Sequence, residues 1–372
     1  MAGPVNPASG PPFRAEHIGS LLRPASLIAA RRRLAAGEIR HDEFAAVEAE
    51  SIAGAVKLQE AAGLAVVTDG EFRRASYHSY FYSRLGEITI DAIPAAESAN
   101  GGRGHQPVAR IGSRIAWHGP IHADDFARLR AVTGALPKIT IPGPCVLHFR
   151  GGNAAVTASA YDDVDLFWND IVDAFRRELA ALAAAGCRYV QIDETAFAKF
   201  GDPDVQAMLA ARGDDWSALI DRYIDVTNRV TQGFPELAIG MHLCRGNRGG
   251  RWHAEGSYEA VAERLFNRLD IGFLFLEYDS PRAGDFTPLR FVPKHKSVIL
   301  GLISTKTAAM EHLDELRSRV TDASRFVDIE RLGVSPQCGF ASVETGNPIT
   351  VDAQEVKLRL VVDLARSIWG TN

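Results

Sequence analysis

The sequence has little cysteine, no long apolar run and no large excess of either charge. Four cysteines in 372 residues argue against a disulfide framework. No uninterrupted apolar run approaches the roughly 18 residues of a membrane-spanning helix. The net charge of −5 gives no support to a role on nucleic acid or on an anionic membrane. We therefore expect neither nucleic acid nor a membrane among the partners.

The N-terminus lacks the apolar core of a secretory signal. Residues 1–13 are rich in Pro, Gly and Ala, which predicts a flexible tail and a cytoplasmic protein. Residues 14–372 show no repeat, no linker and no low-complexity block. Because 46% of the residues are hydrophobic, a chain of this length can bury one large core. We predict a single domain over 14–372.

What the sequence does contain is a regular alternation of short apolar runs with longer amphipathic segments. The amphipathic pattern is clearest at 164–186, where apolar residues recur every three or four positions and Gly186 follows as a C-cap. Eight strand-like runs predict the parallel strands of a (β/α)8 TIM barrel. Residues 86–137 interrupt the alternation and predict an inserted hairpin before the third strand. The eight runs are 17–21, 64–70, 139–147, 188–194, 237–243, 272–278, 297–304 and 332–339.

Metal-ligating side chains stand at the ends of three of these runs. His242 and Cys244 follow the fifth run, Glu277 ends the sixth and Cys338 ends the eighth. Because the carboxyl ends of barrel strands meet at one rim, we expect these side chains to come together. An imidazole, two thiolates and a carboxylate form a ligand set for Zn²⁺, and the sulfur ligands argue against magnesium or calcium. Zinc at such a site would hold a substrate thiol as a thiolate, so the pattern predicts chemistry at sulfur.

The order of the motifs points to a known family. HIGSLLRP, DGEFRR, YVQIDETAF, His-x-Cys at 242–244, Glu277 and SPQCGF occur in succession over roughly 14–369. The chain resembles the C-terminal catalytic barrel of cobalamin-independent methionine synthase, in a single-barrel form. This resemblance implies a zinc-dependent methyltransferase that moves a methyl group from a 5-methyltetrahydrofolate-type donor to homocysteine, giving methionine. It implies zinc ligation by His242, Cys244, Glu277 and Cys338, and binding of the homocysteine amino-acid group by Ile18, Gly19, Ser20, Glu71 and Asp193.

The implied acceptor residues suit a zwitterionic amino acid. Glu71 and Asp193 offer anions to its ammonium group. The backbone N–H groups and the hydroxyl at Gly19-Ser20 can donate hydrogen bonds to its carboxylate. For Glu277, the hardest of the four implied ligands, we expect displacement or lengthening when the substrate thiol enters.

The donor side departs from the family pattern. The longer family members have a second, N-terminal barrel that helps to hold the folate, and nothing in this sequence replaces it. The family has a proton-donating histidine after the seventh strand, where this chain has Lys306 in GLISTKTAAM. Lys306 is therefore a candidate proton donor or a binding group for an anionic donor. The expected partners are homocysteine and a methyl donor, and the oligomeric state stays open.

Three alternatives stay open at this point. The same zinc chemistry serves alkyl transfer to another thiol, as in epoxyalkane:coenzyme M transferases, although a sulfonate thiol would favour extra Arg or Lys in the pocket. A methyl-corrinoid protein could present the methyl group in place of a folate. A non-catalytic zinc-binding subunit would have a closed metal site.

Two further sets of residues have an expected role. The segment 244–258 is rich in Gly and Arg, which makes it a candidate lid or phosphate-binding loop, and we expect His253 to be an ordinary loop residue within it. Cys145 and Cys187 lie in apolar surroundings and are expected to pack in the core.

Overall fold

The computed structural model describes residues 13–90, 108–157 and 160–371. The predicted flexible tail therefore lies almost wholly outside the described residues, as does the middle of the predicted insertion. Among the helices of the described ranges, none is both long and apolar enough to cross a membrane.

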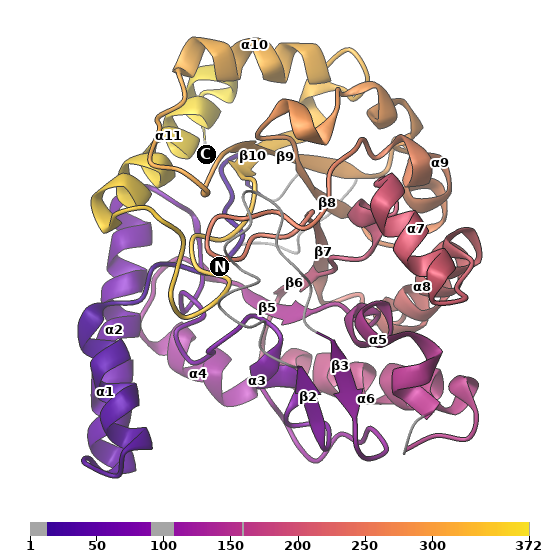
Figure 1. Ribbon diagram of the computed structural model, residues 1–372. Coiled ribbons are helices and arrows are strands. Elements are labelled where there is room, and N and C mark those ends of the chain that lie inside the picture. Colours follow the sequence, from indigo (N-terminus) through magenta and orange to yellow (C-terminus); the bar gives the residue numbers. More distant parts are fainter. Residues whose placement is uncertain (1–12, 91–107, 158–159, 372) are drawn as a thin grey trace.

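Parallel strands form the centre of the molecule, with helices around them (Figure 1). Six strands pair in the order β10-β9-β8-β7-β6-β5, and a second sheet pairs β1 with β4. Because β4 and β5 are separated only by Lys138, whose N–H donates to the Val67 carbonyl at 2.8 Å, the two sheets are continuous. The strands are β1 (Val66–Val67), β4 (Leu136–Pro137), β5 (Ile139–Pro142), β6 (Tyr189–Asp193), β7 (Ala238–Leu243), β8 (Phe273–Glu277), β9 (Ser297–Ile303) and β10 (Leu332–Pro336).

The segment that follows the N-terminal tail closes the ring. Ala15 forms a parallel bridge with Val334 of β10, and the Glu16 N–H donates to the Val334 carbonyl at 2.9 Å. On the other side the Thr68 hydroxyl donates to the Gly19 carbonyl at 2.8 Å. The fold is the predicted (β/α)8 barrel, in which the carboxyl ends of the strands share one rim.

The first two strands are shorter than predicted. Residues 17–21 form no strand, and 64–70 contains only the two residues of β1. The reason is local backbone geometry, because Gly19 has φ +136° and Gly70 has φ +68°. These values lie in the left-handed region, which interrupts an extended ladder and which glycine adopts without steric cost.

The long helices form where the apolar period predicts them. α6 covers Val164–Ala184, and Gly186 follows it with φ +92°. α11 covers Val351–Trp369 and ends at Gly370 in the left-handed conformation. The other helices are α1 (Ala25–Ala35), α2 (His41–Ala61), α3 (Ser79–Tyr82), α4 (Ala123–Ala131), α5 (Val146–Thr157), α7 (Pro203–Ala211), α8 (Trp216–Thr231), α9 (Glu259–Arg268) and α10 (Leu313–Ala323).

The described part of the predicted insertion contains a hairpin. β2 (Ile88–Ile90) pairs in antiparallel fashion with β3 (Ala109–Ile111), and both precede the third barrel strand. This confirms an excursion from the barrel at the expected place. Inside the barrel, a separate apolar cluster includes Tyr189, Phe273 and Phe275.

A buried polar layer lies beside this apolar cluster. Lys138 Nζ lies 3.0 Å from the Glu16 carboxylate and donates to the Gln191 side-chain oxygen at 3.0 Å. The Gln191 side-chain amide then donates to the Ile18 carbonyl and to Asp193 Oδ1, each at 2.7 Å. Polar side chains inside the barrel thereby hold Ile18 and Asp193 in place at the rim.

Candidate metal centre and active site

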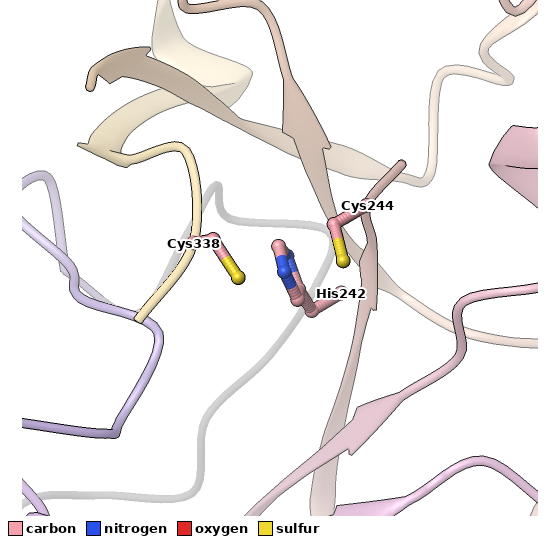
Figure 2. Close-up of side chains that lie close together, drawn as sticks. All are labelled: His242, Cys244 and Cys338. Carbon is pink, nitrogen blue, oxygen red and sulfur yellow. The ribbon is translucent and has the colours of Figure 1, made fainter. Parts of the chain in front are cut away.

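Three of the four predicted zinc ligands converge at the rim. His242 lies in β7, Cys244 follows that strand directly, and Cys338 follows β10. Their ligand atoms lie within 4.8 Å of one another, and all three residues are buried (Figure 2). Neither ring nitrogen of His242 has a hydrogen-bond partner among the described residues. A buried imidazole without partners is costly, so the group fits a metal ion that accepts its lone pair.

The two thiols influence each other strongly. The Cys338 thiol beside Cys244 holds the pKa of the Cys244 thiol well below its usual range. The Cys244 thiolate and burial together raise the pKa of Cys338 well above its own. The arrangement therefore stabilises one thiolate in the protein alone, and a cation would stabilise the second.

The loops that carry the two cysteines are tied together. The Asn247 side-chain amide donates to the Thr305 hydroxyl at 3.1 Å and to the Gly339 carbonyl at 2.9 Å. These bonds fix the loop after Cys244 to the loop after Cys338. The spacing of the two sulfur ligands is thereby set before any metal binds.

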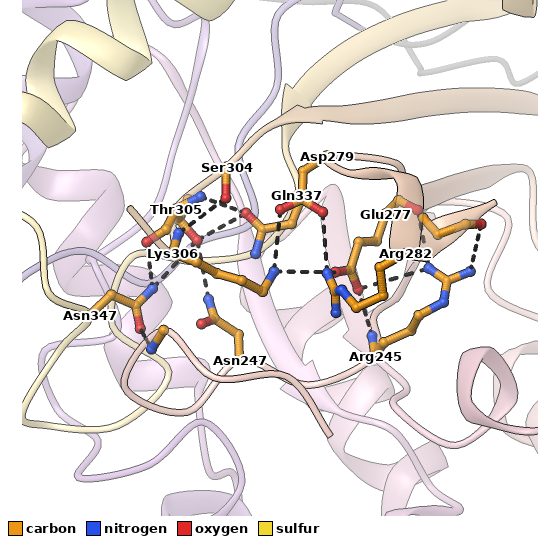
Figure 3. Close-up of polar contacts among 12 residues, drawn as sticks. Arg245, Asn247, Glu277, Asp279, Arg282, Ser304, Thr305, Lys306, Gln337 and Asn347 are labelled. Atoms are coloured by element: carbon orange, nitrogen blue, oxygen red, sulfur yellow. Dashed lines mark hydrogen bonds and ion pairs between the residues drawn. The ribbon is translucent and has the colours of Figure 1, made fainter. Parts of the chain in front are cut away.

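Glu277, the fourth predicted ligand, has other partners in this structure (Figure 3). Its carboxylate accepts from the Arg245 backbone N–H at 2.7 Å and from Arg282 at 2.6 Å, and it pairs with Lys306 at 3.2 Å. Burial raises the pKa of Glu277, but the Lys306, Arg245 and Arg282 cations outweigh burial and hold that pKa well below its usual range. Its role as a metal ligand stays a prediction.

Lys306 belongs to the same network. It lies 3.2 Å from the Glu277 carboxylate and 3.5 Å from that of Asp279. Burial lowers the pKa of Lys306, but the two carboxylates outweigh burial and raise it above its ordinary value. A proton donor near neutral pH needs the opposite shift. The proton-donor role of Lys306 stays a prediction.

Most of the residues implied for the acceptor share one cavity with the metal-ligand group. The cavity is lined by Ile18, Ser20, Glu71 and Asp193 together with His242, Cys244 and Cys338. Gly19 is not part of the lining, but a Cβ there would lie 2.8 Å from Thr140 Cγ2. A larger residue would therefore disturb the turn that places Ser20.

Glu71 is held in an unusual backbone conformation. Its φ is +59°, in the left-handed region that residues other than glycine rarely adopt. Its Oε1 accepts from the Thr140 hydroxyl at 2.8 Å. Its Oε2 is buried, lies 3.7 Å from Arg74 Nη1 and has no hydrogen-bond partner in the described parts of the chain. Backbone strain and a buried oxygen that accepts no hydrogen bond together mark a binding group.

Asp193 ends β6 and is 5% exposed. Burial, opposed by the His242 charge and reinforced by that of Glu71, raises the pKa of its carboxyl to about 7. A cationic ligand in the cavity would favour the ionised form.

The comparisons with known proteins decide the family. The model of the cobalamin-independent synthase catalytic domain matches residues 13–367, almost the same span as the motifs. The chain belongs to the cobalamin-independent methionine synthase family. It is 38% identical to the uncharacterized protein YxjH of Bacillus subtilis over 96% of this chain and 95% of that protein.

Two more distant proteins agree with this membership. The methionine synthase of Pyrococcus furiosus is 22% identical over 87% of this chain and 85% of its own length. A crystal structure of a putative vitamin-B12-independent methionine synthase from Listeria monocytogenes is 32% identical, with a TM-score of 0.73. It covers 97% of this chain and 99% of the Listeria chain. The family consists of methyltransferases that depend on zinc, which agrees with the His/Cys group.

This member of the methionine synthase family has further cavity residues that the sequence did not single out. His253, expected to be an ordinary loop residue, lines the cavity together with other parts of the 244–258 segment. The others come from loops and from helical segments, and although Thr195 and Gly339 lie within the motifs quoted above, only the fold shows that all of them line one cavity. They are Ser76, Tyr77, His78, Arg150, Thr195, Lys199, Gly246, Asn247, Arg248, Gly339, Ser342 and Val343.

Proposed function

We propose that this protein is a zinc-dependent methyltransferase that transfers a methyl group from a 5-methyltetrahydrofolate-type donor to homocysteine, giving methionine. The observation that carries the proposal is a single cavity lined both by the His242, Cys244 and Cys338 group and by the acidic residues Glu71 and Asp193. The first group suits a thiol, and the second suits an ammonium. Homocysteine carries both.

The residues of the chain have separate tasks in this proposal. Glu71 Oε2 and the Asp193 carboxylate bind the substrate ammonium, and the Ser20 hydroxyl binds its carboxylate. Gln191 holds Asp193 in position through the 2.7 Å hydrogen bond from its amide. Held at its amino-acid end, the substrate can reach the metal-ligand group with its sulfur.

Zinc bound by His242, Cys244 and Cys338 would supply a Lewis acid that lowers the pKa of a substrate thiol. Three close protein ligands beside a cavity suit a catalytic metal site better than a closed structural one. This supports an enzyme over a non-catalytic zinc subunit. Glu277 is proposed as a fourth ligand that yields its place to the substrate.

The test is methionine formation by the zinc-loaded protein. Homocysteine is offered with 5-methyltetrahydrofolate, with its polyglutamates, and with methylcobalamin or a methyl-corrinoid protein. We expect methionine with the folate donors. If methionine forms only with the corrinoid donors, the methyl donor is a corrinoid and not a folate. If no donor gives methionine, the proposal is overturned.

One observation favours a second candidate, alkyl transfer to a sulfonate thiol. Arg150, Lys199 and Arg248 line the same cavity and offer the positive charge that such a thiol requires. The assay therefore includes 2-mercaptoethanesulfonate with an epoxide as the alkyl source. Consumption of that pair, without methionine formation from homocysteine, would favour the second candidate.

A further inference from the structure

Three cations line the cavity from three separate elements. Arg150 lies in α5, Lys199 ends the 3-10 helix Phe197–Lys199 after β6, and Arg248 lies in the loop after β7. No carboxylate within the described ranges lies within 4.0 Å of any of the three, although most other buried cations of the barrel have one. The charges are close enough to affect one another, since burial and, after it, Arg150 lower the pKa of Lys199 to about 7 and also lower the pKa of Arg248. The fold has thus gathered like charges that repel.

Arg150 is oriented by neutral partners. Its Nη2 donates to the Tyr77 hydroxyl at 3.1 Å, and its Nη1 lies 3.3 Å from His78 Nε2. Burial, followed by the nearby cations, lowers the pKa of His78 well below its ordinary value, so this imidazole is neutral. Its Nε2 then accepts from Arg150, which leaves the proton on Nδ1. This Nδ1 is buried, since His78 is only 6% exposed, and it has no hydrogen-bond partner among the described residues.

Lys199 is the most confined of the three cations. It is 1% exposed, and no described residue accepts a hydrogen bond from its Nζ. The Nζ lies 5.3 Å from the centre of the Phe149 ring, which compensates only part of the lost hydration. The charges of Cys244, Glu194 and Glu277 raise the pKa of Lys199 but offset burial only in part, so a bound anion would stabilise the ammonium form.

We propose that Arg150, Lys199 and Arg248, named here the cationic wall, bind an oxyanion carried by the methyl donor, with the neutral His78 beside them in the same cavity. The donor is then an anionic molecule, with a carboxylate, sulfonate or phosphate group at this wall. This inference rests on the proposed function for the identity of the second substrate. The existence of the anion subsite itself does not.

The acceptor does not account for the cationic wall. In the proposed function, Glu71 and Asp193 bind the ammonium of homocysteine and Ser20 binds its carboxylate, and all three line the same cavity as the wall. A group-transfer enzyme must hold both substrates in one cavity at once. Positive charge beyond the needs of the acceptor therefore belongs to the donor.

The first test measures sulfate binding to the zinc-loaded protein by calorimetry. We expect one bound sulfate, with affinity that falls as sodium chloride rises. Arg248→Gln and Lys199→Met should each weaken sulfate binding about tenfold, because each removes one charge-assisted contact. Arg251→Gln is the matched control. The backbone of Arg251 forms a β-bridge with that of Arg248 in the same loop, but Arg251 does not line the cavity. Lys199→Met replaces a buried charge with an apolar chain of similar length, so the fold is expected to persist.

The second test assigns the anion to one substrate. Saturating homocysteine should leave sulfate affinity unchanged, whereas 5-methyltetrahydrofolate should displace sulfate. The affinity for 5-methyltetrahydrofolate should fall about tenfold in Arg248→Gln and in Lys199→Met, and not in Arg251→Gln.

Each other outcome overturns the inference. Absent sulfate binding, or equal affinity in the wild type and the two variants, removes the anion subsite. Competition between sulfate and homocysteine assigns the wall to the acceptor. Failure of the proposed function looks different, because methionine would then not form while sulfate binding kept its dependence on Lys199 and Arg248.

Discussion

Two clusters at the same rim of the barrel contrast sharply in how their polar atoms are paired. In the first, His242, Cys244 and Cys338 lie together, and the His242 ring nitrogens have no hydrogen-bond partner among the described residues. In the second, the Glu277 carboxylate has three partners, including Lys306 at 3.2 Å. The imidazole of the first cluster lacks a hydrogen-bond partner among the described residues, whereas the carboxylate of the second has three.

The contrast suggests different tasks for the two clusters, metal binding for the His/Cys group and positioning of the backbone for the Glu277 cluster. A bound ligand stabilises buried polar atoms that have no hydrogen-bond partner. A metal ion is therefore expected to bind most favourably at the His/Cys group. The Glu277 cluster holds backbone instead, because its Oε2 accepts from the N–H of Arg245, the residue after Cys244. Glu277 therefore supports Cys244 from outside the metal site.

The largest expected effect comes from removing a thiolate ligand. Cys338→Ala should lower zinc affinity by well over about a hundredfold and abolish methionine formation, because ligand loss exceeds the loss of supporting contacts. Metal analysis after dialysis measures it. Cys187→Ala is the control, since Cys187 is equally buried but its Sγ contacts only the Tyr189 carbonyl at 3.4 Å. Full zinc occupancy in Cys338→Ala would remove the site.

A smaller loss of zinc is expected for Glu277→Gln. Three nitrogen and sulfur ligands remain, so zinc affinity should fall about tenfold. Unfolding by urea should become easier by about 3 kcal/mol, because Arg282 and Lys306 lose their shared buried carboxylate. Unchanged zinc affinity with the same loss of stability would make Glu277 a positioning residue alone.

Asp193→Asn should affect the acceptor and not the metal. We expect the homocysteine KM to rise about tenfold to a hundredfold with zinc retained, since a charge-assisted contact to the ammonium is lost. Burial raises the pKa of Asp193 to about 7. The carboxyl is neutral below that pH, so the wild-type KM should rise as the pH falls below 7, and this rise should disappear in Asp193→Asn. An unchanged KM at pH 8 would contradict the acceptor role.

The smallest effect is expected for Lys306→Gln. Arg245 and Arg282 stay beside Glu277, so the free energy of unfolding should fall by only about 1–2 kcal/mol. If Lys306 acts only through Glu277, kcat should fall less than about tenfold and its pH profile should keep its shape. A loss of about a hundredfold, together with a lost titration step, would instead make Lys306 the proton donor.

Much of the fold could be predicted from local pattern. The amphipathic period and Gly186 mark α6, and the β-branched runs mark β5 to β10. The predicted strand at 17–21 was wrong because an apolar run does not reveal that Gly19 takes φ +136°. That segment is held by side chains such as Thr68, which are distant in sequence.

The metal-ligand group could be predicted from the sequence because cysteine is rare in this chain and because the motifs occur in the order of the family. His242, Cys244 and Cys338 needed only the rule that the carboxyl ends of barrel strands meet at one rim. The cationic wall had only a partial signal, the Gly- and Arg-rich segment 244–258 that contains Arg248. Arg150, Lys199 and Arg248 are common surface residue types, and only the packing of α5, the 3-10 helix after β6 and the 244–258 loop brings them to one cavity.

Residue chemistry and strand order were therefore enough to predict the (β/α)8 barrel and the His/Cys group at its rim. Which polar atoms are left without partners was decided by tertiary structure, because pairing depends on contacts between segments far apart in the chain. That is why Glu277, which the sequence placed in the ligand set as its most readily displaced member, is found paired with Arg282 and Lys306. For the same reason the unpaired cations that point to an anionic donor became visible only in the folded cavity.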